Sequence, residues 1–195
     1  MADVAKSIED RNFDILDINM GCPVPKVVNN GEGSALLKSP DLIEEIVRKV
    51  SSAISKPVTV KVRIGFENAP VDIVEIAKRV EDAGAAAIAV HGRTRQQYYS
   101  GTADWDTIRR VKEAVTIPII GNGDVDSPLK AEALMKQTGC DAVMVGRAVR
   151  GNPWLFRELN HYFRTGELME RPSTEEIREM ILRQARKQIG RAQSE

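Results

Sequence analysis

The 195-residue sequence is poor in cysteine, and its two cysteines form no recognisable cluster. Cys22 and Cys140 lie far apart and belong to no CxxC or Cys/His motif. This spacing argues against a disulfide framework and against a zinc site. We therefore expect a protein of the reducing cytoplasm with no bound metal.

Long apolar runs and net charge are also lacking. A membrane-spanning helix needs about 18 consecutive apolar residues, and no segment approaches that length. The start, MADVAKSIEDR, has no apolar core of the kind found in signal peptides, so we expect no membrane partner. The 28 basic residues balance 28 acidic ones, so only a local basic surface could indicate a nucleic-acid partner.

Short apolar segments alternate with amphipathic ones over most of the chain. The apolar segments predict strands at 13–18, 58–64, 86–90, 117–120 and 142–145. The apolar residues at three-to-four spacing predict helices at about 40–54, 70–83, 105–115 and 127–137. This alternation is typical of parallel strands joined by right-handed crossovers, and thus of the α/β class.

The type of α/β fold follows from what stands after each strand. The first strand is followed by GCPVPKVV, which is not the G-x-G-x-x-G fingerprint of an open nucleotide-binding sheet. Polar residues and glycines instead gather at every strand exit, as in (β/α)8 barrels. A barrel needs eight units and the chain has five. We predict an incomplete TIM barrel over residues 1–155 and the start of a helical domain over 156–195.

Two glycine-containing turns on consecutive units predict a phosphate site. GNGD (121–124) follows the fourth strand, and GRA (146–148) follows the fifth and is expected to open a helix. Glycines allow backbone N–H groups to turn toward an anion, and barrels commonly bind phosphate at their last two strand exits. The alternative is that both segments are only tight turns.

Basic residues at two other strand exits predict an anionic or electron-rich partner. Lys61 and Arg63 are two residues apart in VKVRIG and therefore face the same side of a strand, opposite Val60 and Val62. His91 ends the next strand, and the following loop is expected to carry Arg93, Arg95, Tyr98 and Tyr99. Guanidinium and aromatic groups together suit a phosphate backbone or stacked bases. A surface edge strand, a buried structural histidine and ordinary exposed charges are the alternatives.

The two cysteines differ in their expected placement. Cys140 precedes a strand at the structural end of its unit and is interpreted as core filler. Cys22 lies between Gly21 and Pro23 at a strand exit, where its side chain can project over the barrel mouth.

These residues resemble those of the tRNA-dihydrouridine synthases. The resemblance rests on DINMGCPVPKVVNNGEGSALL, PVTVKVRIG, VHGRTRQQYYSGTADW, IPIIGNGD and VGRAVRGNPWLF, which span about residues 13 to 156. It implies an FMN-binding TIM barrel followed by a helical domain, with NADPH as reductant and tRNA as substrate. The first three barrel strands and most of the helical domain are then expected to be missing.

The resemblance also implies roles for individual residues. Cys22 would donate a proton to uracil C5, because a thiol with an ordinary pKa of about 8.5 stays protonated near neutral pH. The substrate would be bound by Asn19, Arg63, Arg93 and Arg95. The cofactor would be bound by Lys61, His91, Gly121, Asn122, Gly123, Asp124, Gly146 and Arg147. Two alternatives stay open: another FMN barrel such as a dihydroorotate dehydrogenase, and a non-catalytic RNA-binding fragment.

The last predicted helix carries Arg183, Lys187 and Arg191 at i, i+4 and i+8, and thus on one face. Cations near a helix C-terminus can simply complement the helix dipole. The alternative is that this face contacts the tRNA backbone.

Overall fold

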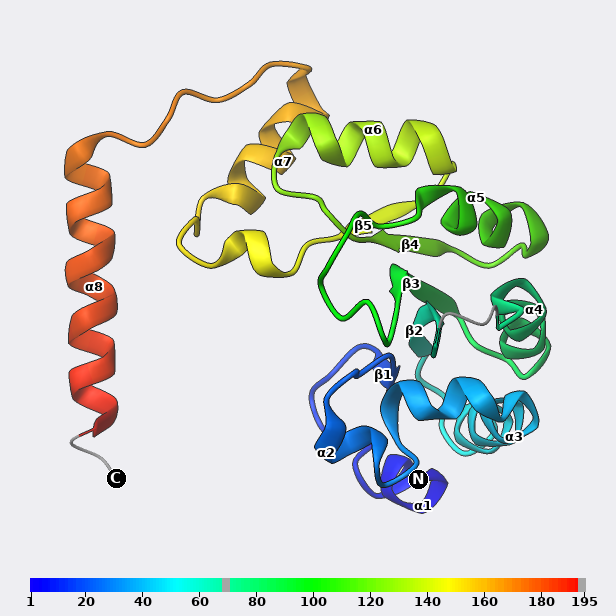
Figure 1. The fold of residues 1–195 in the computed structure, drawn as a ribbon. Coiled ribbons are helices and arrows are strands. Elements are labelled where there is room, and N and C mark those ends of the chain that lie inside the picture. The colour runs from blue at the N-terminus through cyan, green and yellow to red at the C-terminus, as the bar shows by residue number, and fades with distance from the viewer. Residues whose placement is uncertain (68–70, 193–195) are drawn as a thin grey trace.

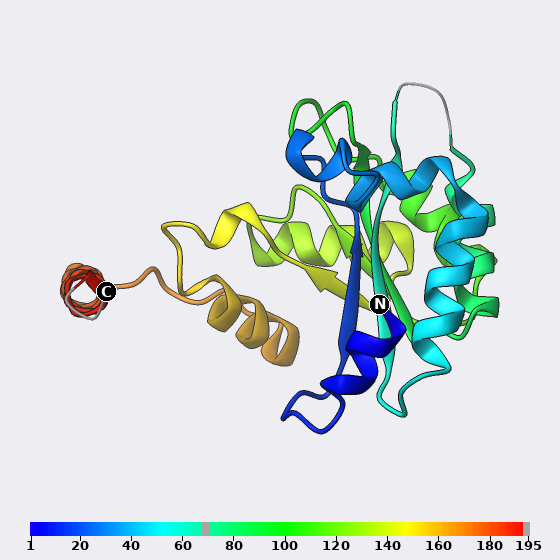
Figure 2. The same cartoon turned by 90° about the horizontal axis from the view of Figure 1, so that it is seen from below.

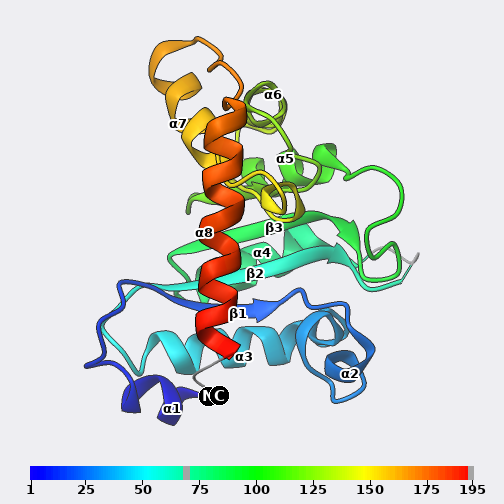
Figure 3. The ribbon, with the colours of Figure 1, turned by 90° about the vertical axis from the view of Figure 1, so that its left-hand side faces the viewer.

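The computed structural model describes residues 1–67 and 71–192, and its centre is a five-stranded parallel sheet. The strands are β1 (Leu16–Met20), β2 (Val58–Gly65), β3 (Ala87–Thr94), β4 (Ile119–Asn122) and β5 (Ala142–Met144). Their order in the sheet is β1-β2-β3-β4-β5, with every neighbouring pair parallel. Figure 3 shows β1, β2 and β3 running in one direction. This sequential order is the arrangement of consecutive barrel strands, and the predicted α/β class is confirmed.

Four helices connect the strands and cover one side of the sheet (Figures 1 and 2). They are α3 (Pro40–Ser51), α4 (Ile73–Asp82), α5 (Trp105–Ala114) and α6 (Pro128–Thr138), close to the predicted ranges. The residue 70 at which we expected one helix to begin lies outside the described residues. Side-chain caps on backbone N–H groups begin three of these helices, at Asp72, Asp104 and Ser127. Gly139, in the left-handed conformation, ends α6.

The hydrophobic core lies between the sheet and this helix layer. Val58, Val60 and Val62 of β2 are at most 2% exposed. They belong to one cluster with apolar residues of β3, β4 and the four helices, among them Val47, Val80, Ile88, Ile108, Ile119 and Leu134. As predicted, Val60 and Val62 therefore face the helices, which leaves Lys61 and Arg63 on the opposite face of β2.

Three strands differ from their predicted bounds by two residues or more, and one of them, β4, spans 119–122 rather than 117–120. Strand β1 begins at Leu16 rather than residue 13, because its partner β2 begins at Val58 and Lys56 instead binds the carbonyl oxygens of Arg11 and Phe13. Strand β3 continues to Thr94. His91 therefore lies within the strand rather than at its end, and Arg93 belongs to the strand and not to the loop that follows it.

Three short helical segments were not expected from the sequence. They are α1 (Ala2–Ser7), α2 (Pro25–Val28) and the 3-10 turn η1 (Gly33–Lys38). The helix expected to open at 146–148 is only the three-residue 3-10 turn η2 (Arg147–Val149). Two helices follow, α7 (Leu155–Thr165) and α8 (Thr174–Ala192), over most of the predicted helical segment 156–195. None of the helices in the described ranges is long and apolar enough to cross a membrane.

The last two helices differ in how they join the rest of the chain. Helix α7 packs beside α6, and the Tyr162 hydroxyl donates a hydrogen bond to Glu132 (3.0 Å). Helix α8 stands apart on the side of the sheet away from α3 and α4 (Figures 1 and 2). An ion pair between Arg157 and Glu176 (3.7 Å) links the first turn of α8 to α7.

Candidate active site

The register of the sheet brings the predicted polar residues side by side. Asn19 of β1 pairs with Lys61 of β2, whereas Arg63 of β2 pairs with His91 of β3. His91 in turn pairs with Asn122 of β4. Neighbouring strands are about 4.8 Å apart, so side chains from four strands converge near the carboxyl end of the sheet.

A cavity of about 960 Å³ opens at this end of the sheet. Ten of the predicted site residues line it: Asn19, Cys22, Lys61, Arg63, His91, Asn122, Gly123, Asp124, Gly146 and Arg147. The other three, Gly121, Arg93 and Arg95, do not. Sequence reasoning missed Lys130 at the start of α6 and Arg150 after η2, which add two cations to the lining. Arg150 could have been predicted from the sequence, because it belongs to the GRAVRGNPW segment that continues from the exit of the fifth strand.

The backbone around Cys22 is fixed from both sides. The Asn19 side-chain oxygen accepts a hydrogen bond from the amide of Gly21 (3.0 Å). The Cys22 carbonyl accepts two bonds from Ser34, one from its amide (3.0 Å) and one from its hydroxyl (2.8 Å). Gly33 has a φ of +58°, and a Cβ there would lie 2.9 Å from the Cβ of Cys22. The partly exposed, free thiol is therefore carried on a rigid turn.

The cavity is strongly electropositive. The pKa of His91 is lowered to about 3 by burial first, and then by the charges of Arg63, Lys61, Arg93 and Arg147. His91 is consequently neutral at physiological pH. Burial and the Arg63 charge also lower the pKa of Lys61 to about 8, against a smaller opposing effect of Asp17. Cations held this close require an anionic or electron-rich partner.

Two arginines flank an aromatic ring at the edge of the cavity. The guanidinium of Arg147 lies 4.5 Å from the ring centre of Tyr99, and that of Arg63 lies 5.7 Å from it. Arg63 also donates to the carbonyl oxygens of Thr94 and Tyr98, both at 2.9 Å. Tyr98 and Tyr99 are 40% and 45% exposed, so the cavity carries an accessible aromatic rim.

Gly121 lies within strand β4 and not in the turn that follows it. A Cβ at this position would lie 2.9 Å from Cys140 Sγ and 2.9 Å from Leu134 Cδ2. Strand β4 extends through Asn122, and its alternation turns position 121 toward helix α6. The glycine therefore permits close packing of the strand on the helix. Cys140 is buried beside it, as expected for core filler.

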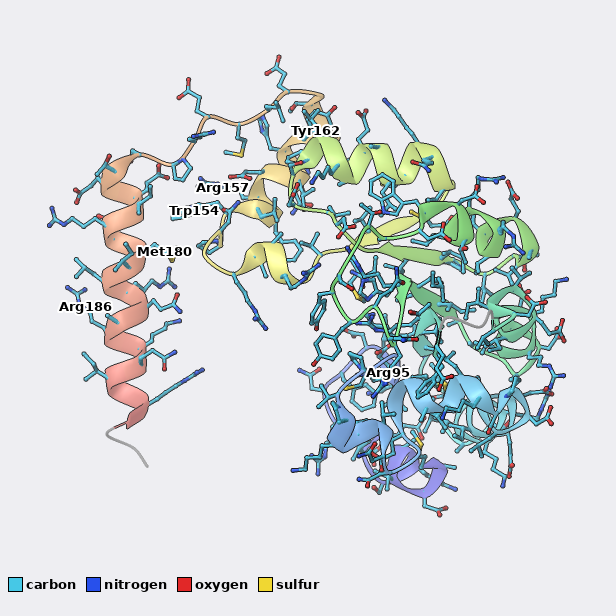
Figure 4. The ribbon with its side chains drawn as sticks, in the orientation of Figure 1. Arg95, Trp154, Arg157, Tyr162, Met180 and Arg186 are labelled. Atoms are coloured by element: carbon cyan, nitrogen blue, oxygen red, sulfur yellow. The ribbon has the colours of Figure 1, made fainter. Side chains whose placement is uncertain are left out.

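Arg93 and Arg95 are not exposed neighbours in one loop. Arg93 lies in strand β3, is 2% exposed and pairs with Asp124 (2.7 Å). Side chains alternate between the two faces of a sheet only as far as the strand extends. Because β3 ends at Thr94, this alternation does not place Arg95 on the same face as Arg93. Arg95 is the first residue of the loop that follows β3 (Figure 4), and its guanidinium lies over the ring of Phe66 (5.3 Å).

Comparisons with known proteins agree on one family. The family model "Dihydrouridine synthase (Dus)" matches residues 1–193. The tRNA-dihydrouridine synthase B of Pseudomonas putida is 47% identical over 182 residues, covering 93% of this chain and 54% of the relative. Its namesake from Vibrio parahaemolyticus is 46% identical, with coverages of 93% and 56%. The namesake from Proteus vulgaris is 47% identical, with coverages of 95% and 58%.

Among solved structures, a nitroalkane oxidase from Streptomyces ansochromogenes aligns with a TM-score of 0.46 at 18% identity, over 73% of this chain and 35% of that protein. The chain spans about half the length of the curated relatives it matches. The family model nevertheless covers nearly every residue, and the family's barrel fold accounts for the order of the five strands. The chain therefore belongs to the dihydrouridine synthase family.

Proposed function

We propose that this cavity is the site at which a uridine of tRNA is reduced to 5,6-dihydrouridine, with FMN as cofactor and NADPH as reductant. The observation that carries the proposal is the presence of a free thiol, Cys22, in the same cavity as a row of cations. The curated relatives are named for this activity. The cytoplasm, where tRNA and NADPH occur together, is the compartment that the proposal requires.

The residues present fit a flavin mononucleotide. FMN carries a doubly charged phosphate and a flat ring, and the cavity offers both cations and sufficient volume. Asn122, Gly123, Gly146 and Arg147 would hold the phosphate. A Cβ added at Gly146 meets no atom within 4 Å, so this turn leaves its backbone open to a ligand. Lys61 and His91 would lie against the ring.

Bound FMN, once reduced by NADPH, supplies the hydride that is added to uracil C6. The remaining requirement is a proton at C5, which Cys22 would donate before regaining a proton from water. Lys61 would offset negative charge on the ring system, because a fixed cation in a partly buried site stabilises a nearby anion strongly. His91 is neutral and can form a hydrogen bond without adding charge. Asn19, whose side-chain oxygen accepts a hydrogen bond from the amide of Gly21, would help to position the base.

Two regions are proposed to contact tRNA. The target base must leave the folded RNA to reach Cys22, and the rim formed by Tyr98, Tyr99 and Arg63 would receive it. Residues 156–195 would form the start of a helical tRNA-binding domain after the barrel segment 1–155. Within this part, one face of α8 carries Arg183, Lys187 and Arg191.

An absorbance spectrum of the purified protein, recorded before and after NADPH is added, tests the cofactor. We expect flavin bands that bleach with NADPH. To test the substrate, dihydrouridine is measured in tRNA from a synthase-deficient strain with and without the full-length gene. A colourless protein that still shifts tRNA on a gel would overturn the enzymatic proposal and favour an RNA-binding module.

A further inference from the structure

The buried guanidinium of Arg93 donates hydrogen bonds to groups from two separate loops. Its Nη2 lies 2.7 and 2.9 Å from the two carboxylate oxygens of Asp124, in the turn after β4. The same Nη2 donates to the carbonyl oxygen of Gly101 (2.6 Å), and Nε donates to that of Ser100 (3.1 Å). Arg93 therefore connects the loop of residues 95–103, which follows β3, to the turn of residues 122–126, which begins at the last residue of β4.

Further bonds fasten the same loop to the same turn. The amide of Ala103 donates to Asp124 (2.7 Å), and the indole N–H of Trp105 donates to the carbonyl oxygen of Gly123 (3.2 Å). A Cβ at Gly123 would lie only 2.6 Å from the Cβ of Ala103. The two segments thus meet without room for a side chain between them, and a displacement of one is transmitted to the other.

Asp124 combines an uncommon backbone conformation with a partly buried carboxyl group. Asp124 has a φ of +59°, a region that residues other than glycine seldom occupy. Burial alone would raise the pKa of its carboxyl group, but the bonds from Ala103 and Arg93 lower it. Among the described residues, Nη1 of Arg93 has no hydrogen-bond partner, so the pairing with Asp124 is the main compensation for a buried charge.

We propose that Arg93 and Asp124 are positioning residues that hold the base-facing loop 95–103 and the phosphate-facing turn 122–126 in one fixed arrangement, without touching either ligand. The inference rests on the function proposed above for the two segments. It replaces the expected direct contact of Arg93 with the substrate and that of Asp124 with the cofactor. Loop 95–103 carries Tyr99 to the cavity, and the turn supplies Gly123, so one ion pair sets both walls.

Asp124→Asn in the full-length protein separates this role from simple electrostatics. The carboxylate lies 3.8 Å from Arg147 and close to the proposed phosphate site. If only charge mattered, its removal would strengthen FMN binding. If Asp124 positions the turn, we expect FMN to bind about tenfold more weakly, the loss typical of one charge-assisted bond. Riboflavin, which lacks the phosphate, should change less than twofold.

Arg93→Lys tests the same ion pair from the other side. Lysine keeps the charge but has one nitrogen in place of the two, Nε and Nη2, from which Arg93 reaches Ser100, Gly101 and Asp124. We expect Arg93→Lys to weaken FMN binding as Asp124→Asn does, and to raise KM for tRNA. A protein with both substitutions should bind FMN little more weakly than either single variant, because both remove the same ion pair. A direct RNA contact would instead change only tRNA binding. Arg109→Lys and Asp106→Asn, an exposed arginine–carboxylate pair on α5, are the matched controls.

Amide hydrogen exchange provides a measurement that does not depend on the proposed function. Asp124→Asn should speed exchange in residues 98–103, although the substitution lies in another loop. Unchanged exchange there, or tighter FMN binding, would overturn the positioning role. A wild-type protein that binds no flavin would instead overturn the proposed function and leave the exchange result to decide this inference.

Discussion

Replacing Lys61 with methionine is expected to stabilise the flavin-free protein while abolishing turnover. Lys61 is half-buried on the cavity face of β2, and burial and Arg63 lower its pKa from 10.5 to about 8. Each pKa unit corresponds to about 1.4 kcal/mol. Keeping this lysine charged in the folded state therefore costs on the order of 3 kcal/mol. Methionine has a similar length and no charge, so Lys61→Met should recover much of that free energy.

The stabilisation should depend on pH in a defined direction. Below pH 8 the lysine is charged in both the folded and the unfolded protein, so the full penalty is present. Between about pH 8 and pH 10.5 the folded protein loses its proton first, and the advantage of methionine should shrink toward zero. Urea unfolding of flavin-free wild type and Lys61→Met at pH 7, 9 and 10.5 measures this difference.

Lys49→Met on α3 is the control, since Lys49 is exposed and its loss should change stability by less than about 0.5 kcal/mol. Added FMN should stabilise the wild type more than Lys61→Met, because the cation then gains an anionic partner. A Lys61→Met protein that is less stable than the wild type at pH 7, or equally more stable at every pH, would refute the reasoning.

Three further substitutions test other parts of the structure. Cys22→Ala in the full-length protein should stop dihydrouridine formation and leave NADPH-driven flavin bleaching intact; near-normal dihydrouridine in tRNA would rule out the proton donor. Gly121→Ala should destabilise the fold by about 1–3 kcal/mol in thermal unfolding, with partial rescue by Cys140→Ala and no direct change in FMN binding. If the Gly121→Ala protein instead binds FMN weakly at unchanged stability, Gly121 contributes to the phosphate site. Charge reversal of three cations on α8 should weaken tRNA binding and flatten its salt dependence, whereas an unchanged slope would indicate a purely helix-dipole role for Arg183, Lys187 and Arg191.

The fold class and most of the site followed from local patterns in the sequence. Apolar periodicity located all five strands and four connecting helices. The alternation of Lys61 and Arg63 against Val60 and Val62 fixed which face of β2 meets the cavity. Parallel strands in sequential order place their carboxyl ends together, so Asn19 and His91 could be assigned to one site without knowledge of any contact.

What the sequence could not reveal depended on pairing between distant segments. Nothing local indicates that β3 continues through Arg93, because its length is set by neighbouring strands and by the bond from Asp104 to Gly92 (2.6 Å). A buried arginine and an exposed one look alike in a motif such as HGRTR. The packing role of Gly121 could not be read from the sequence for a related reason. GNGD combines a packing glycine and a turn glycine, and only the presence of Leu134 and Cys140 behind the strand distinguishes them.

Helix α8 has a thermodynamic consequence of its own. Its 19 residues extend about 28 Å, and its apolar residues stay accessible, with Ile181 63% and Ile189 59% exposed. Figure 4 shows Met180 and Arg186 projecting to different sides of it, without a neighbouring element around them. A helix held by little more than its own hydrogen bonds and a Ser173–Glu176 capping box is marginal in water. Circular dichroism measures all helices, including α8, whereas tryptophan fluorescence reports only on the surroundings of Trp105 and Trp154, outside α8. We therefore expect the two measurements to give different unfolding transitions, so that a single midpoint does not describe this chain.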